Sequence, residues 1–405
     1  MSGTTNGDVD VAPPDDTRPT SADTSVGTLA PDDADGPAPT RTTVTDGATD
    51  GAPAARGATT TASRTARARK PTKSTRRPTI RDVAAESGVS RGTVSRVING
   101  GHWVSPEARA AVEDAIRRTG YRANEHARSL VTGRSNSVAF LLTEPQHLLF
   151  EDPNFPRLLR GATEAAASRE MPMVLLVAGT AEERRRVAGY VEAGHVDGVL
   201  LISSHEGNPM IAELLRLGVP TVACGVPLGY EDKVAYVAAD DLSGGRTMTQ
   251  HLLDAGRRRI ATITGPMDTP GGVLRLRGYR EALGDAFDPA LVVHGDYSRE
   301  SGRLGMARLL AEHSDVDAVF VHSDLMAAGA LVAAQAAGRV VPDDVAVAGF
   351  DDNGVAEQLH PALTTMRQPY ERISSEMVRL LVDVVEGAEP AAVTLPTSLV
   401  VRDSA

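Results

Sequence analysis

The chain has 405 residues, of which 41% are hydrophobic and 23% charged, so it is long enough for more than one folded domain. Its only cysteine, Cys224, excludes a disulfide framework and a thiolate metal cluster. No apolar run reaches the length of a membrane span, and the polar, acidic N-terminus lacks the apolar segment of a secretory signal. We therefore expect a cytoplasmic protein without a metal or cofactor.

The formal net charge of −11 is unevenly distributed along the chain. Residues 1–54 carry ten aspartates and two arginines, whereas residues 55–134 carry seventeen Lys and Arg against six Asp and Glu. A basic segment in an acidic chain is typical of a DNA reader, because the phosphate backbone supplies most of the non-specific affinity. A basic run alone is usually a solvated surface, so this one gains meaning only from the motif it contains.

Residues 1–77 form a low-complexity tail of Ala, Thr, Pro, Gly, Asp and Arg. So few large apolar side chains cannot offset the entropy of ordering, and we expect the tail to be disordered. Its basic end, Arg64 to Arg77, either contacts DNA phosphates or is a solvated arm.

A helix-turn-helix is predicted at the start of residues 78–123. Thr79, with Asp82 three residues later, resembles a capping box, and Gly88 interrupts the first helix. Ser90 can cap a second helix, and both helices space their apolar residues at i, i+3 and i+4. A third helix follows from Ser105-Pro106 to Gly120, and completes an all-α head.

In DNA-binding proteins of this kind the second helix enters the major groove and its N-terminal residues meet base edges. Here those residues are Arg91, Gly92, Thr93, Ser95 and Arg96, all polar or small. An ordinary helical hairpin within a larger domain is the alternative. Residues 88–92 also match G-x-S-x-G, the hydrolase nucleophile elbow, but that motif needs a strand before its serine and the pattern here is helical.

A hinge segment is predicted over residues 124–136. Asn124 can cap a short helix that contains Ala127 and Leu130 and ends at Gly133. Such a helix is too short to be stable alone, so we expect it to fold against a partner chain, DNA, or both.

Residues 137–405 alternate short β-type runs with amphipathic helical segments, which predicts doubly wound parallel sheets. The length favours two lobes, the first about 137–258 and 368–392, the second about 259–367 and 393–405. A ligand is expected between the lobes, beyond the carboxyl ends of the strands.

Several motifs in a fixed order carry a resemblance to a known family. They are TIRDVAAESGVSRGTVSRVING (79–100), VSPEAR (104–109), GYRANEHARSL (120–130), RLRGYREAL (275–283), VFVHSDLMAAGAL (319–331), VPDDVAVAGFDD (341–352) and PALTTMRQP (361–369). From about residue 78 to its end the chain resembles the lactose-repressor (LacI/GalR) family of bacterial transcription regulators. The resemblance implies a helix-turn-helix head on a core like that of periplasmic sugar-binding proteins. It also implies an oligomer that binds a near-palindromic DNA operator under control of a small effector, usually a sugar. Because no heptad extension follows Val401, we expect a homodimer.

The resemblance places Arg91, Gly92 and Arg96 at base-reading positions, and Arg96 could pair bidentately with a guanine. Gly92 departs from relatives that have a long side chain there, at a cost to helix stability of ~1 kcal/mol. Leu130 falls where the family inserts an apolar wedge into the minor groove, although it could instead pack two hinge helices together. The further residues implied to contact DNA are Thr79, Ser90, Thr93, Ser95, Asn99, Tyr121, Asn124 and Ala127.

Arg275 and Asp351 align with the family's main effector contacts, and an arginine with a carboxylate can hold vicinal hydroxyls. Ser323 and Asp324 follow a predicted strand, where Asp324 is either a ligand contact or a helix cap. Phe155 either stacks on a sugar ring or belongs to the core.

Two departures from the family pattern bear on the identity of the effector. Gly225 stands where some members carry a sugar-binding aspartate, and an insertion at 147–153 should reshape the pocket.

Two other classes of function stay open. A solute-binding protein without DNA function is opposed by the basic head and the missing export signal. An α/β enzyme is opposed by the absence of G-x-x-x-x-G-K-[ST], of H-E-x-x-H and of G-x-G-x-x-G after a strand, so we expect no catalysis.

Overall fold

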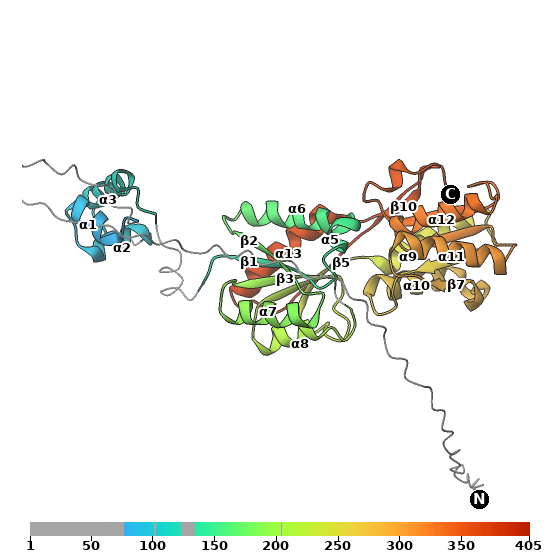
Figure 1. Cartoon of the computed structure of the whole chain (residues 1–405), viewed down its shortest axis with the longest axis horizontal. Helices are drawn as coiled ribbons and strands as arrows, with labels where there is room; N and C mark the ends of the chain where they lie inside the picture. The colour runs from blue at the N-terminus through green and yellow to red at the C-terminus, as the bar shows by residue number, and fades with distance from the viewer. Residues whose placement is uncertain (1–76, 101–102, 123–133, 204) are drawn as a thin grey trace, which may run out of the picture. The chain divides into compact units, whose positions relative to one another are not determined.

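The structure is a computed structural model that describes residues 77–100, 103–122, 134–203 and 205–405 (Figure 1). The predicted tail, and the hinge residues Asn124, Ala127 and Leu130, lie outside these ranges. Within them, no helix is long and apolar enough to cross a membrane.

The head consists of α1 (Ile80–Ser87), α2 (Arg91–Ile98) and α3 (Pro106–Thr119), as predicted. Each helix begins at the expected cap. The Thr79 amide donates to the Asp82 carboxylate at 2.7 Å, and the Ser90 hydroxyl accepts from the Thr93 amide at 3.1 Å. The three helices close over a small core of Val83, Val94, Val97, Val112 and Ala115.

The first lobe is built on a six-stranded sheet in the order β11-β5-β4-β3-β1-β2, with every pair parallel. Its strands are β1 (Val138–Leu142), β2 (Met173–Val177), β3 (Gly198–Ile202), β4 (Thr221–Cys224), β5 (Ala235–Ala239) and β11 (Ala392–Leu395). One face packs on α6 (Asn154–Ala167) and α13 (Tyr370–Val385), the other on α7 (Ala181–Glu192) and α8 (Pro209–Arg216). The short α5 (Leu148–Glu151), which precedes α6, occupies the insertion.

The second lobe repeats this plan with the order β12-β10-β9-β8-β6-β7. Its strands are β6 (Ile260–Thr264), β7 (Val292–His294), β8 (Ala318–Val321), β9 (Ala346–Asp351), β10 (Thr364–Arg367) and β12 (Ser398–Val400). One face packs on α9 (Asp241–Asp254) and α10 (Pro270–Leu283), the other on α11 (Arg299–Glu312) and α12 (Asp324–Ala336). The two-lobed α/β fold is confirmed, with one difference: the edge strand β12 runs antiparallel to β10.

The chain changes lobe at other points than those expected. Helix α9 was assigned to the first lobe, yet Met248 and Leu252 pack in the core of the second. Strand β11, which the expected boundary at 392 divides, pairs with β5 of the first lobe. The crossings therefore fall near Asp240, between β10 and α13, and between β11 and β12. Amphipathic periodicity identifies a helix but does not say which of two sheets it covers.

Helices α9 and α10 approach so closely that only glycine fits at their crossing. A Cβ atom on Gly278 would lie 2.2 Å from the Leu242 carbonyl oxygen, whereas one on Gly189 of α7 would meet nothing within 4 Å. We expect Gly278→Ala to lower the free energy of unfolding by about 1–3 kcal/mol through overpacking. The exposed control Gly189→Ala should leave it unchanged or raise it by up to ~1 kcal/mol. Urea denaturation measures both, and equal effects would contradict the close crossing.

A DNA-binding head and a pocket between two lobes

The exposed face of α2 carries the residues predicted to read bases. Arg91, Gly92 and Arg96 are exposed, while Val94 and Val97 of the same helix are buried in the head. A Cβ atom on Gly92 would meet only the Ser90 hydroxyl, at 3.7 Å. The packing of the head therefore does not require glycine at this position.

Other predicted DNA contacts have structural roles in the head. Ser90 caps α2, and the Asn99 amide donates to the Ser95 hydroxyl at 3.4 Å. Tyr121 is half-buried against the head core. Thr79 donates through its hydroxyl to Asp82 at 2.7 Å. Their contacts with DNA stay predictions, as do those of Asn124, Ala127 and Leu130.

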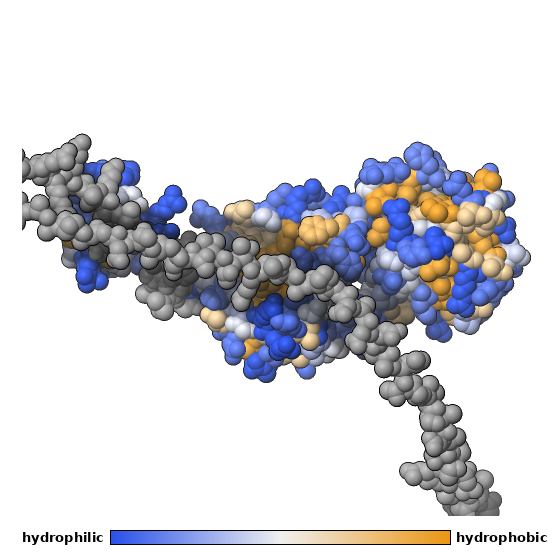
Figure 2. All heavy atoms as spheres, in the orientation of Figure 1, coloured by the Kyte–Doolittle hydropathy of each residue, from blue (hydrophilic) through white to orange (hydrophobic). Residues whose placement is uncertain are grey.

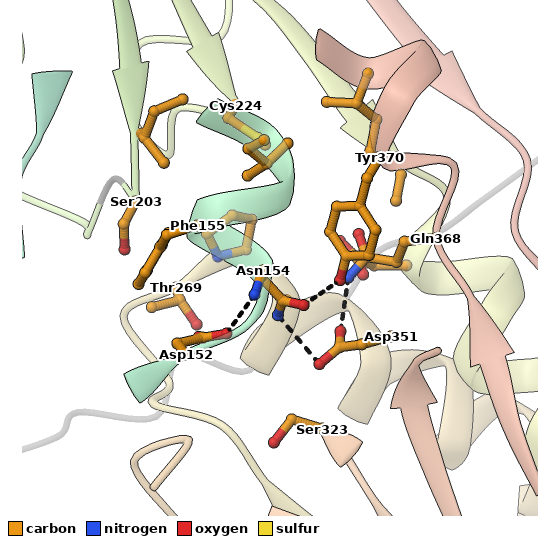
Figure 3. A pocket seen from close by; sticks show the side chains of 18 of the residues that line it. Asp152, Asn154, Phe155, Ser203, Cys224, Thr269, Ser323, Asp351, Gln368 and Tyr370 are labelled. Atoms are coloured by element: carbon orange, nitrogen blue, oxygen red, sulfur yellow. Dashed lines mark hydrogen bonds between the residues drawn. The ribbon is translucent and has the colours of Figure 1, made fainter. Parts of the chain in front are cut away.

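A pocket lies between the two lobes, at the carboxyl ends of their strands (Figure 3). It encloses about 950 Å³ when counted out to its open mouth. Four of the predicted effector residues line it together: Phe155 on α6, Arg275 on α10, Ser323 before α12 and Asp351 at the end of β9.

Arg275 is buried and held rigidly in place. Its Nε donates to Asp241 Oδ1 at 2.8 Å, and its Nη1 donates to the His322 carbonyl. The guanidinium carbon stacks 3.7 Å from the centre of the Phe350 ring. Because the Phe350 ring stacks on the guanidinium and fixed partners accept from its Nε and Nη1 groups, its remaining N–H groups are preorganised for a ligand.

Asp351 connects the two lobes. Its carboxylate lies 3.7 Å from Arg275 Nη1, and accepts from the amides of Gln368 at 2.7 Å and Asn154 at 3.2 Å. The Asn154 carbonyl in turn accepts from the Tyr370 hydroxyl at 2.6 Å (Figure 3). Burial raises the pKa of Asp351, and the positive charge of Arg275 opposes this rise.

The backbone at Asp351 is strained as well, since its φ of 128° is uncommon for any residue except glycine. Such strain clusters at ligand sites, where the surrounding structure enforces it.

Asp324 was predicted to contact the effector, but it does not line the pocket. It is fully buried, and its carboxylate accepts from the Asp352 amide at 2.7 Å and the Thr365 hydroxyl at 2.5 Å. It is not the helix cap either, because Ser323 caps α12 by accepting from the Met326 amide. Asp324 instead ties β9 and β10 together behind the pocket.

Several lining residues were missed in the sequence. Asp152 lies in the insertion at 147–153, which is predicted from the sequence to reshape the pocket. Its burial, with the nearby charge of Asp351, raises the pKa of this carboxyl to about 7. Gln368 lies in the PALTTMRQP motif, whereas no local signal identifies Asn154, Tyr297 or Tyr370.

Two positions show how local backbone shapes the pocket wall. Tyr297 has a φ of 69°, and its ring occupies the space that a Cβ on Gly265 would need. Gly225, with a φ of 86°, also lines the pocket, so an aspartate there would be strained.

These features define a class of protein: a helix-turn-helix DNA-binding head followed by a two-lobed core with a ligand pocket between the lobes. Residues 79–124 match the family described as bacterial regulatory proteins, lacI family, and residues 249–405 match a periplasmic binding protein-like domain. The chain belongs to the lacI family and is a DNA-binding transcriptional regulator.

Relatives match over nearly their whole length. The HTH-type transcriptional regulator CelR of Thermobifida fusca is 48% identical over 335 residues, which cover 81% of this chain and 98% of the relative. The ribose operon repressor of Halalkalibacterium halodurans is 33% identical, covering 80% and 96%.

Two solved structures are similar over four fifths of the chain. A CelR–cellobiose complex has a TM-score of 0.66 at 46% identity, and covers 81% of this chain and 100% of the other. A lac repressor dimer bound to operator and the anti-inducer ONPF has a TM-score of 0.70 at 26% identity, with coverage of 81% and 99%.

We expect Arg96→Ala to weaken binding to the DNA upstream of the protein's own gene by ~1–3 kcal/mol and to relax the preference at one base pair. The matched control is Arg117→Ala in α3, which removes one exposed charge away from α2. Titrations on the natural site and on single-base variants measure both effects. An equal loss in the two variants would show that Arg96 supplies charge and reads no base.

Proposed function

We propose that the protein is a homodimeric repressor of a near-palindromic operator in the cytoplasm, and that a neutral sugar bound in the pocket controls it. The observation that supports the effector site most strongly is the fixed Arg275 beside Asp351 in a pocket shared by both lobes. Buried charged groups that line a pocket are typical of ligand-binding sites.

The charges of the pocket favour a neutral effector. Asp152, Asp241 and Asp351 face a single buried cation, Arg275. A phosphorylated or carboxylated ligand would meet this acidic lining and be repelled. Sugar hydroxyls, in contrast, can donate to the carboxylates and accept from the guanidinium, and the rings of Phe155 and Tyr297 offer apolar faces for sugar C–H groups.

Cellobiose is the first sugar to test. A relative nearly half identical to this chain is solved as a complex with it. Other disaccharides are the alternatives within the same chemical class.

We infer that the effector acts by shifting the population of lobe arrangements. Because the chain crosses between the lobes at three points, the lobes can rotate about these crossings. A ligand that contacts both lobes favours the closed arrangement, and closure moves the first residues of the core, to which the head is attached. This change would release the operator.

We also propose that the pocket binds without catalysis. Burial raises the pKa of the Cys224 thiol to about 12, so this cysteine is protonated at neutral pH and is a poor nucleophile. Arg275 and Asp351 are committed to each other and to fixed partners, which suits recognition better than proton transfer.

An apolar surface on the second lobe is a suitable dimer contact. Leu304 of α11 and Val332 of α12 are 54% and 51% exposed, and Val340 beyond α12 is 55% exposed. Figure 2 shows hydrophobic residues gathered where Figure 1 labels these two helices. Contiguous apolar patches on soluble proteins commonly mark such interfaces.

We expect Val332→Glu to convert the dimer to a monomer, because it buries a charge in the contact. The control is Val401→Glu, an equally drastic change at a 59% exposed residue away from α11 and α12. Sedimentation analysis measures the mass of both variants. A dimeric Val332→Glu protein would place the interface elsewhere.

We expect Arg275→Ala to abolish cellobiose binding and release of DNA, while operator binding without sugar persists.

Asp152→Asn should weaken cellobiose binding at pH 8 by about 10–100-fold, since a hydrogen bond to a charged group is worth ~1.5–3 kcal/mol. The pKa of Asp152 is about 7, so its carboxylate accepts fully above that pH and progressively less below it. The advantage of the wild type over Asp152→Asn should therefore shrink from pH 8 to pH 6.

Calorimetry on both proteins across this pH range measures the ratio of affinities. A ratio that stays constant with pH would remove Asp152 from the binding site.

A further inference from the structure

One histidine links the two lobes beside the pocket. His205 follows β3 of the first lobe, and its Nε2 lies 2.7 Å from Glu144 Oε1, which follows β1 of the same lobe. Its Nδ1 lies 2.9 Å from Asp268 Oδ2, which precedes α10 of the second lobe. The neighbouring residues Ser203 and Thr269 line the pocket itself.

Further contacts hold this bridge in position. The Ser203 hydroxyl donates to the Glu144 carboxylate at 2.5 Å. The Glu206 amide donates to the Asp268 carbonyl at 2.6 Å, a second link between the lobes. Glu144 is 15% exposed and His205 30%, whereas Asp268 is 52% exposed. His205 is thus anchored to Glu144 within the first lobe. Separation of the lobes would remove its other partner, Asp268.

The geometry requires a protonated imidazole. Both ring nitrogens face carboxylate oxygens, and a carboxylate can only accept. A neutral imidazole has one N–H, so one of the two contacts would set a nitrogen lone pair against a carboxylate. The hydrogen bond to Glu144, opposed by burial and helped by Asp268, raises the pKa of His205 to about 9. Asp152, whose own pKa responds to Glu144, is the next ionisable group of the pocket on this side.

We propose that protonated His205 is a latch that holds the two lobes closed over the effector by pairing Glu144 of one lobe with Asp268 of the other. The latch rests on the proposed function in one respect, namely that the effector closes the lobes. Opening removes Asp268 but leaves Glu144, the larger of the two contributions, beside the ring, so the pKa of His205 falls only part of the way from about 9 toward its ordinary value near ~6.5.

The sign of the pH dependence follows from this difference. A group whose pKa is higher in the closed form stabilises that form when protonated, and this contribution is lost as the pH rises through the closed-state value of about 9. Closure at pH 8.5 should therefore take up a fraction of a proton. Asp152, with a pKa of about 7, is ionised at this pH and contributes little to the uptake.

The test is calorimetric titration of the full-length protein with cellobiose at pH 8.5, in two buffers with different ionisation enthalpies. We expect proton uptake by the wild type and its loss in His205→Gln and in Asp268→Asn, with cellobiose binding weakened about 3–30-fold at pH 7.5. His195→Gln, a change at an exposed histidine elsewhere on the first lobe, is the control and should behave as the wild type. Uptake that persists in Asp268→Asn would overturn the latch, because it would show a pair confined to one lobe.

A second measurement does not depend on the choice of sugar. The ring-proton NMR signal of His205, identified by its loss in His205→Gln, is titrated in the free protein and with cellobiose. A midpoint near 9 with cellobiose, lower in the free protein and lowered by Asp268→Asn, supports the latch. An ordinary midpoint in both samples overturns it. A raised midpoint that depends on Asp268, without any heat of cellobiose binding, would reject cellobiose as the effector and keep the latch.

Discussion

The buried positive charge of Arg275 is the constraint on which the core depends. An unpaired buried guanidinium would cost several kcal/mol, so the chain must place carboxylates around it. Asp241, at the start of α9, and Asp351, at the end of β9, fill this role. Asp241 thus begins a helix that packs on the second sheet, and Asp351 ends a strand of that sheet. The close crossing of α9 and α10, permitted by Gly245 and Gly278, brings Asp241 within reach.

From this pair the polar network extends into the first lobe. Asp351 accepts from Asn154 and Gln368, and Tyr370 completes the link to α13. The lobes are thus joined on one side by the chain crossings and at the pocket floor by hydrogen bonds that a ligand can compete for or reinforce. The His205 bridge adds a charged contact at another side of the same pocket. A core whose lobes meet through exchangeable polar contacts can have two arrangements of similar free energy.

The head is stabilised in a different way from the two-lobed core. Its hydrophobic core is small, and caps at Thr79, Ser90 and Ser105 satisfy the first turns of all three helices. The apolar residues of α2 are committed to that core, which leaves Arg91 and Arg96 facing outward. Arg91 and Arg96, which are predicted to read bases, are therefore separate from the apolar core, whereas Thr79, Ser90 and Tyr121 combine a predicted DNA contact with a structural role.

The sequence by itself determined the local structure of this protein: the capped helices of the head, the apolar strands, and the motifs that carry Arg275, Ser323 and Asp351. These depend on short spacings along the chain, where periodicity and capping chemistry act directly. Only the tertiary structure decided which sheet α9 covers, that Asp324 lies behind the pocket wall, and that Asp152, Asn154 and Tyr370 line it. It also decided the contact of His205 with Asp268, sixty-three positions away. Such long-range pairings depend on how two sheets and their crossings are arranged in space, for which the local pattern of residues carries no signal.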